Sequence, residues 1–508
     1  MNSSRTINTV KNLGIGAGTQ IISLLLSFIT RTVFVVTLGN EYLSVNGLFT
    51  NILTLLSFTE LGIGSAIIYS LYRPLALGDR EQVGKLINLF SIAYRYIAIA
   101  ILLLGLCVVP FLSQIISDVP DVKENISLLY ILFLLNTVCS YIWGYKKSLL
   151  IADQKNYVVI TIHTVLNILL VCLQVFILYL THNFILYLLA FIGITLLNNI
   201  LTTIYVNKKY SWIVEYEFMK LKVEERISIF ANIKNIVIYK LGSVILNGSS
   251  SIIISGMIKT TLVGICSNYS MIISAVTTII NQGVAGIAAS IGNYNVTASK
   301  KDNESVFRQL CLLSFWAVGM VSISMSCLLS PFVKLWLGAE YILDDAVVVI
   351  LVLGFYTLMI NSIPSSFRTA MGLFKEARLA PLFAAIINVL FGILGAKLWG
   401  LSGVFVATVI ARILTYCVID PYYVYKKGFE MSPRSYFIRF LNWILILAAS
   451  YTISYNIIRM IYVSGFLGLL LDTAICLLIF NVIFFSVYSK NDDLIIIVRR
   501  VKNNLMRK

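Results

Sequence analysis

The 508-residue sequence is poor in charged side chains and contains only two histidines. Charged residues make up 12% of the chain, whereas a soluble domain carries roughly 25%. The longest hydrophilic stretch, residues 207–234, is too short to fold as a soluble domain and has the character of a connector. Lipid must therefore be the main solvent of this protein.

Cysteine is also sparse and scattered. The eight cysteines fall singly inside apolar stretches, without the close spacing of a zinc or redox site. We interpret them as small buried hydrophobic side chains and expect neither disulfides nor a metal. The glycines at Gly14, Gly16 and Gly18 lie in an apolar helix pattern and lack the strand and loop of a nucleotide site. We therefore expect no cofactor, and we exclude ATP as an energy source within this chain.

Hydrophobic residues are abundant, at 59% of the chain. A membrane-spanning helix needs about 20 predominantly apolar residues to cross the hydrocarbon layer. About fourteen segments meet that requirement: 13–38, 43–68, 86–112, 126–145, 157–180, 184–206, 236–258, 262–285, 310–330, 346–364, 379–398, 401–425, 436–458 and 465–488. The sequence thus predicts an all-α integral membrane protein.

The basic residues separate by side of the membrane. The formal net charge is +16, and most Lys and Arg residues lie in alternate loops. The intervening loops contain only Lys123, Lys259, Lys334, Lys397 and Arg459. The positive-inside rule then places both termini in the cytoplasm, in agreement with an even number of helices. Topology signals and contacts with anionic membrane lipids explain these bases, so nucleic acid is not needed as a partner.

Similar motifs recur in the two halves of the chain at a nearly constant offset. IYVNKK at 204–209 matches YYVYKK at 422–427, both where a helix leaves the membrane. Two parallel bundles related by an axis along the membrane normal form a transporter plan, because rocking one on the other exposes a central site to alternate sides. The repeat predicts two pseudo-symmetric six-helix lobes plus an extra helix pair. The expected domains are an amino-terminal lobe at 1–206, a cytoplasmic connector at 207–234, a carboxy-terminal lobe at 235–427, and helices 13 and 14 with a cytoplasmic tail at 428–508.

The segment RTVFVVTLGNEYLSVNGLFTNILTLLSFTELGIGSAIIYSLYRPLALGDREQV (31–83) resembles the polysaccharide transporter family, the O-antigen and capsule repeat-unit flippases. The resemblance continues through KLGSVILNGSSSIIIS (240–255) and FRTAMGLFKEAR (367–378) and covers most of residues 1–430. It implies the multidrug/oligosaccharidyl-lipid/polysaccharide flippase superfamily, with the multidrug-extruder-like fold. One departure is that the chain has Ser249, Ser250 and Ser251 after the asparagine of the helix-seven segment, where many relatives carry an Asp. An ion-coupling role of that position is therefore in doubt.

This resemblance implies a flippase that moves undecaprenyl-pyrophosphate-linked oligosaccharide repeat units across the bacterial cytoplasmic membrane by alternating access. The implied pathway is that of capsule, O-antigen or another surface polysaccharide, with a polysaccharide polymerase and glycosyltransferases as partners. Such a protein is not an enzyme. One alternative is a cation-coupled multidrug extruder of the same superfamily. The other is a multi-pass membrane polymerase or glycosyltransferase, which the short outer loops disfavour.

Ionisable groups inside a bilayer are costly unless they face a polar cavity or a partner. An arginine suits a pyrophosphate because its planar fork donates two hydrogen bonds and stays charged. The candidate substrate-cavity residues are Arg31, Glu60, Arg95, Lys240 and Arg412, and the candidate ion-coupling residues are Asp420 and Asp472.

Each candidate also has a structural interpretation. Arg31 lies too deep in the first helix for easy snorkelling, so it either lines the cavity or pairs with Glu60. Arg95 and Lys240 could instead reach the cytoplasmic headgroups. Asp420 precedes a proline near a helix end, where a solvated cap is the alternative. Asp472 lies in the extra helix pair and could simply bond a neighbouring helix.

Overall fold

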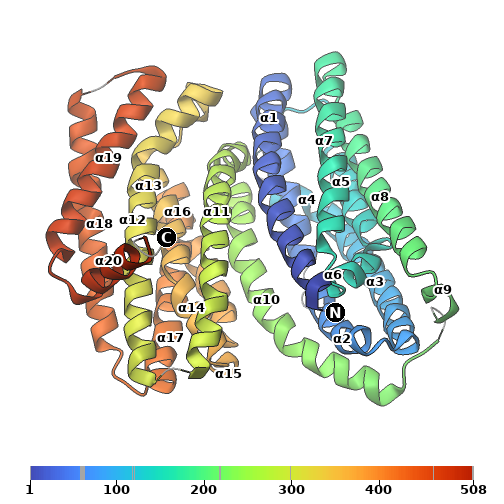
Figure 1. The fold of residues 1–508 in the computed structure, drawn as a ribbon. Helices are drawn as coiled ribbons and strands as arrows, with labels where there is room; N and C mark the ends of the chain where they lie inside the picture. The colour runs from blue at the N-terminus through green and yellow to red at the C-terminus, as the bar shows by residue number, and fades with distance from the viewer. Residues whose placement is uncertain are drawn as a thin grey trace. The chain divides into compact units, whose positions relative to one another are not determined.

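The computed structural model describes residues 2–57, 63–116, 118, 120–216, 219–297, 299–461 and 463–505. All regular elements in these ranges are helices (Figure 1). The chain divides into two compact units, Met1–Gly264 and Ile265–Lys508. The predicted all-α fold is confirmed.

Long helices build the first unit, and α1 packs along α7 and α10. Phe34 of α1 contacts Phe184 and Tyr187 of α8 edge-on, at ring-centroid distances of 5.6 and 5.3 Å. Aromatic pairs of this geometry stabilise a core beyond the area that they bury. The helices are α1 (Asn2–Leu56), α2 (Ile63–Leu77), α3 (Arg80–Val108), α4 (Leu112–Ile115), α5 (Ile126–Tyr141), α6 (Lys147–Ala152), α7 (Asn156–Thr181), α8 (Phe184–Lys209), α9 (Ile213–Tyr216) and α10 (Val223–Met257).

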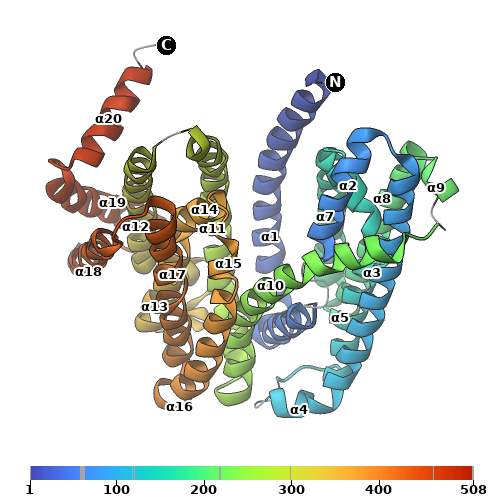
Figure 2. The ribbon, with the colours of Figure 1, turned by 90° about the horizontal axis from the view of Figure 1, so that it is seen from below.

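The second unit is centred on α12, which packs against α13, α18 and α19. Phe315 of α12 stacks on Trp443 of α18 at a centroid distance of 5.1 Å. After α19 the chain turns and forms a separate terminal helix, α20 (Figure 2). The helices are α11 (Thr261–Thr297), α12 (Lys300–Leu337), α13 (Asp345–Ile360), α14 (Ser362–Ala370), α15 (Phe374–Ala377), α16 (Ala380–Leu414), α17 (Tyr416–Tyr423), α18 (Arg434–Ile461), α19 (Gly465–Tyr488) and α20 (Asp492–Leu505).

Among the described residues, ten helices are long and apolar enough to cross a membrane, or eleven if the bent pair of α5 and α6 counts as one span. Part of the difference from fourteen arises because α1 and α16 each consist of two helices that meet at a single glycine. Gly39 (φ 83°) interrupts α1, and Gly400 (φ 57°) interrupts α16. Glycine adopts this left-handed conformation without the steric cost of a Cβ atom. Both breaks fall between two predicted segments, so hydropathy and backbone agree at these positions.

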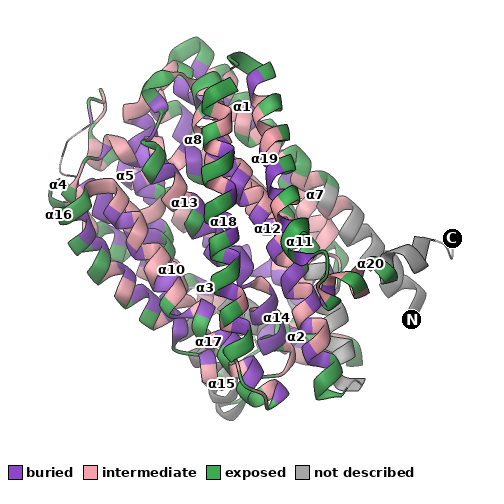
Figure 3. Ribbon diagram, turned by 90° about the vertical axis from the view of Figure 1, so that its left-hand side faces the viewer, coloured by how far each residue is buried: buried purple, intermediate pink, exposed green. Residues whose placement is uncertain are grey.

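Many large apolar side chains on these helices are exposed, as lipid-facing surfaces require. On α18 and α19 they include Leu445, Met460, Phe466 and Leu478 (Figure 3). The chain is thus a multi-pass membrane protein. All eight cysteines are free, and Cys107 and Cys172 are exposed, where we expected buried side chains. An apolar thiol is compatible with a lipid-facing position, so hydrophobic context alone did not predict burial.

The same succession of helices occurs in both units. α5 and α13 each have 16 residues and end at a break, after which α6 and α14 continue. The left-handed residue His182 separates α7 from α8, and Gly400 occupies the corresponding place within α16. This succession agrees with the repeat in the sequence. α10 packs on α1 and α2 and belongs to the first unit, so the two units meet later in the chain than the connector at 207–234. The lobe boundaries read from the repeat stay a prediction.

Candidate functional site

Arg31, the strongest sequence candidate, lies on α1 and is partly exposed. Its guanidinium is close enough to Tyr187 of α8 to interact with it electrostatically. Glu60, its proposed ion-pair partner, lies outside the described residues. Arg31 is therefore placed beside the aromatic cluster of α1 and α8 in the first unit.

Lys240 and Arg412 occupy different environments. Lys240 lies on α10 in the first unit and is partly exposed. Arg412 lies on α16 in the second unit, is buried, and donates a hydrogen bond from Nη1 to the carbonyl oxygen of Gly354 at 2.6 Å. Since Gly354 belongs to α13, the Arg412 side chain links two helices of the same unit.

Asp420 is buried at the centre of a polar cluster in the second unit. Its side chain is only 2% exposed. Oδ1 lies 2.9 Å from Nε of Arg368, and Oδ2 accepts a hydrogen bond of 2.8 Å from the Asn361 amide. Asn361 is the residue at the break between α13 and α14. The alternative of a solvated cap is therefore wrong, because both carboxylate oxygens have partners inside the protein.

Asp472 lies on α19, partly exposed, near a pair of thiols. Cys476 of the same helix and Cys327 of α12 are close enough to interact with each other and, electrostatically, with Asp472. Among the described residues, no group of three or more His, Cys, Asp or Glu side chains could hold a metal ion. The setting of Asp472 is a contact between α12 and α19.

The break between α5 and α6 provides a second polar centre, in the first unit. Trp143 adopts a left-handed conformation (φ 58°), which is strained for a residue with a side chain. Asn199 of α8 donates its side-chain amide to the carbonyl oxygens of Cys139, Ser140 and Ile142, at 3.0, 3.2 and 2.8 Å. Broken helices persist at membrane depth only where such partners satisfy the freed backbone groups. Asn199 therefore supports this break, and sequence reasoning missed it.

Arg95 lies in a groove beside that break. The groove has a volume of about 720 Å³ and is lined by α3, the segment after α5 and Lys220 of the connector. None of the five other sequence candidates that the structure describes lines it. From the sequence alone Lys220 has only a topology role, because a base in a loop gives no indication of the helix that it approaches.

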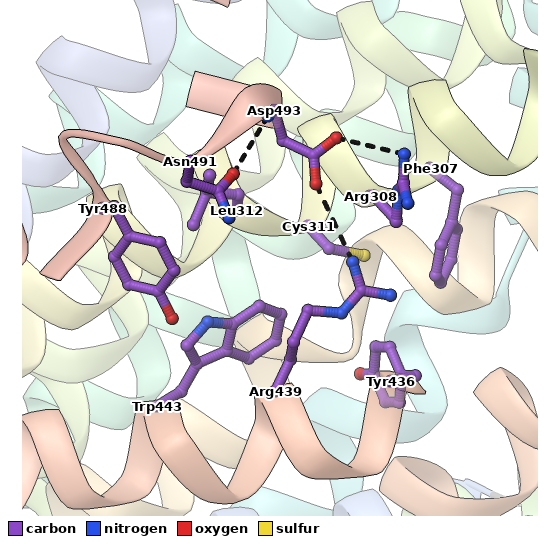
Figure 4. Close-up of a pocket in the computed structure, with 10 residues that line it drawn as sticks. All are labelled: Phe307, Arg308, Cys311, Leu312, Tyr436, Arg439, Trp443, Tyr488, Asn491 and Asp493. Atoms are coloured by element: carbon purple, nitrogen blue, oxygen red, sulfur yellow. Dashed lines mark hydrogen bonds and ion pairs between the residues drawn. The ribbon is translucent and has the colours of Figure 1, made fainter. Parts of the chain in front are cut away.

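A charged network ties α20 to the second unit (Figure 4). Oδ1 of Asp493, on α20, lies 3.4 Å from Nη2 of Arg308 on α12. Oδ2 of the same carboxylate lies 3.9 Å from Nη1 of Arg439 on α18. Glu304 joins the same network through Arg308, at 3.5 Å, and through the hydroxyl of Tyr425, which donates to it at 3.0 Å. Burial raises the pKa of Asp493 above its ordinary value, and the two guanidinium groups act in the opposite direction. This network could not be predicted from the sequence, because the helices that carry it, α12, α18 and α20, are far apart along the chain.

Comparison with known proteins gives no match to a family model and none to a curated protein. Solved structures do match. The lipid II flippase MurJ in an inward closed conformation covers 93% of this chain and 98% of its own, with a TM-score of 0.67 and 14% identity. An inward-facing multidrug resistance MATE family transporter of the MOP superfamily covers 78% and 92%, with a TM-score of 0.60 and 14% identity.

The chain has the MurJ/MATE fold. The MATE transporter VcmN from Vibrio cholerae agrees, covering 82% of this chain and 96% of its own at a TM-score of 0.56 and 14% identity. The MurJ/MATE fold confirms the multidrug-extruder-like fold that the resemblance implied. At this identity the fold is what the proteins share.

Proposed function

We propose that this protein is a flippase for undecaprenyl-pyrophosphate-linked oligosaccharide repeat units, serving the synthesis of a surface polysaccharide. It would work by alternating access in the bacterial cytoplasmic membrane, with both termini cytoplasmic and without catalysing a reaction. A polysaccharide polymerase and glycosyltransferases would be its partners. The substrate class is the one that the segment at 31–83 implies by resemblance.

The observation that carries this proposal is the extent of the match to the lipid II flippase. That match leaves 7% of the 508 residues uncovered, or about 36. α18 and α19 together are longer, with 28 and 24 residues, so they cannot both lie outside the match. The matched MATE transporters cover only 78% and 82% of the chain. The wider match therefore favours a lipid-linked substrate over a soluble drug.

Fixed cations within the two units support the same substrate. Arg31 and Lys240 lie partly exposed in the first unit. A pyrophosphate is best held by arginine, which keeps its charge and donates two hydrogen bonds at once. We propose that Arg31 and Lys240 contact the headgroup, with Arg412 as a positioning residue because its guanidinium already binds the Gly354 carbonyl.

The test is translocation by the purified full-length protein in liposomes. A fluorescent undecaprenyl-pyrophosphate oligosaccharide is placed in both leaflets, and an impermeant quencher reports the fraction that reaches the outer face. We expect quenching to go beyond the outer-leaflet half only when the protein is present. Quenching equal to that of protein-free liposomes would refute the proposal.

A cation-coupled multidrug extruder is the second candidate, because MATE structures share the fold. An ethidium efflux assay under a proton or sodium gradient separates the two. Gradient-driven efflux of the dye without movement of the oligosaccharide lipid would favour the extruder.

A further inference from the structure

The groove beside Arg95 has the composition of a lipid site. α3 contributes an apolar wall that includes Ile92, Ala98, Ile99 and Leu102, and the segment after α5 contributes Ile142 and Trp143. None of the fourteen lining residues is acidic. Trp143 is 46% exposed, and an aromatic ring in the same groove as basic side chains is typical of the level where lipid headgroups meet acyl chains. The groove therefore combines an apolar length with positive charge.

The length of the groove fits a phospholipid. Asn88 and Leu102 both line it and are 14 residues apart on α3, which corresponds to about 21 Å along a helix. The amide of Asn88 donates a hydrogen bond of 2.9 Å to the carbonyl oxygen of Met219, which holds the connector against α3. That contact places Lys220 at one end of the groove. Arg95 follows roughly 10 Å further along the helix from Asn88.

The positive charge of Arg95 favours an anionic ligand. Its side chain is exposed within a membrane-spanning helix, and no carboxylate among the described residues forms an ion pair with it. An unpaired cation at membrane depth is costly, and a lipid phosphate can lower that cost by accepting charge-assisted hydrogen bonds. The charge, the apolar wall and the aromatic side chain thus point to one type of ligand.

We propose that this groove binds an anionic glycerophospholipid of the surrounding bilayer. Its phosphate contacts Arg95 and Lys220, and an acyl chain lies along Ile99, Leu102 and Ile142. The lining residues all belong to the first unit, so the site does not depend on the second. A transported substrate needs a site that both bundles expose alternately, whereas a lipid held by one unit can remain bound throughout the cycle.

The test is native mass spectrometry of the delipidated full-length protein, titrated with phosphatidylglycerol or with phosphatidylcholine. We expect phosphatidylglycerol to bind more tightly, and the double variant Arg95→Gln/Lys220→Gln to weaken its binding about tenfold by removing charge-assisted contacts. Arg95→Lys should retain part of the affinity, since it keeps the charge but loses the fork. Lys208→Gln is the matched control: Lys208 is exposed at the end of α8 in the same unit and does not line the groove.

Three outcomes would overturn the proposal. The first is equal affinity for the two phospholipids, and the second is unchanged phosphatidylglycerol binding in the double variant. The third is displacement of phosphatidylglycerol by an undecaprenyl diphosphate in the wild type but not in the double variant, which would make the groove a substrate site. The measurement does not require transport, so it stands apart from the test of the flippase function.

Discussion

Asp420 of α17 and Arg368 of α14 form a buried ion pair, with Oδ1 and Nε 2.9 Å apart. Both residues are at most 5% exposed. The pair fixes the second half of a broken helix to a neighbouring one, and the Asn361 amide at the break binds the same carboxylate. Removing one partner would leave the other buried and uncompensated.

We therefore expect Asp420→Ala or Arg368→Ala to lower the free energy of unfolding by about 3–5 kcal/mol. The double variant should lose less than the two single losses combined, because no orphaned charge remains. Thermal and denaturant unfolding in detergent measure both quantities. Arg434→Ala, at an exposed position at the start of α18, is the control. Additive losses in the double variant would contradict a direct pair.

Asn199 supports the break after α5 through three carbonyl oxygens. Asn199→Ala should lower the free energy of unfolding by roughly 1–3 kcal/mol, the usual range for buried polar groups left unsatisfied. Asn456→Ala is a matched control, since Asn456 is exposed and bonds only to its own helix. Equal effects of the two substitutions would show that the break needs no support from α8.

The raised pKa of Asp493 gives a pH dependence of known sign. The folded protein binds this proton more tightly than the unfolded chain, so this group's contribution to stability falls as the pH rises from about 4, the ordinary aspartate value, through the folded-state value. Asp493→Asn cannot titrate. We expect the melting temperature of the wild type, relative to this variant, to be lower at neutral pH than near pH 4. A relative melting temperature that increases with pH would mean that Arg308 and Arg439 outweigh burial.

Arg31 tests the proposed headgroup contact. Arg31→Ala should lower oligosaccharide-lipid translocation about tenfold or more, through loss of a charge-assisted partner. Arg31→Lys should restore it in part, because an ammonium keeps the charge without the fork. Expression and melting temperature need to be matched, since an arginine on α1 could also be structural. Normal translocation by a well-folded Arg31→Ala protein would remove this residue from the mechanism.

The topology prediction places both termini and the connector at 207–234 in the cytoplasm. Single cysteines introduced at exposed positions such as Lys208 and Lys222 of a cysteine-free variant should resist an impermeant maleimide in whole cells and react after lysis. Labelling of either position in intact cells would reverse the orientation.

Hydropathy and the repeat predicted most of the helices, because long apolar runs at membrane depth leave few other backbone solutions. They did not predict where two of the helices continue beyond a break. The predicted segment 346–364 stopped short of Arg368, yet α14 extends to Ala370 and buries that side chain. Lys146 repeats the pattern: it lies just past the predicted segment 126–145, is buried, and donates to the Oδ1 atom of Asn207 at 2.9 Å.

The sequence predicted which ionisable residues lie within the helices, but it did not predict which residues surround them. Rarity of charge within apolar runs was enough to single out Arg95 and Asp420. It could not show that Lys220 lines the same groove as Arg95 or that Arg368 pairs with Asp420, because both bases lie in segments that resemble solvated loops. A charged side chain in an apparent loop can be solvated or can pack against a helix. Tertiary packing decides between these two positions, and the sequence does not show it.

The turns at Gly39 and Gly400 affect how much of this protein would be accessible from outside the cell under the predicted topology. With both termini cytoplasmic, these two turns would face outward, and each consists of a single residue in a left-handed conformation. Such a turn exposes very little surface to which an antibody or a phage could bind. A tag inserted into it would disturb the two helices that it connects. Recognition from outside would fall on the longer segments, such as the one between α12 and α13, and epitope mapping should start there.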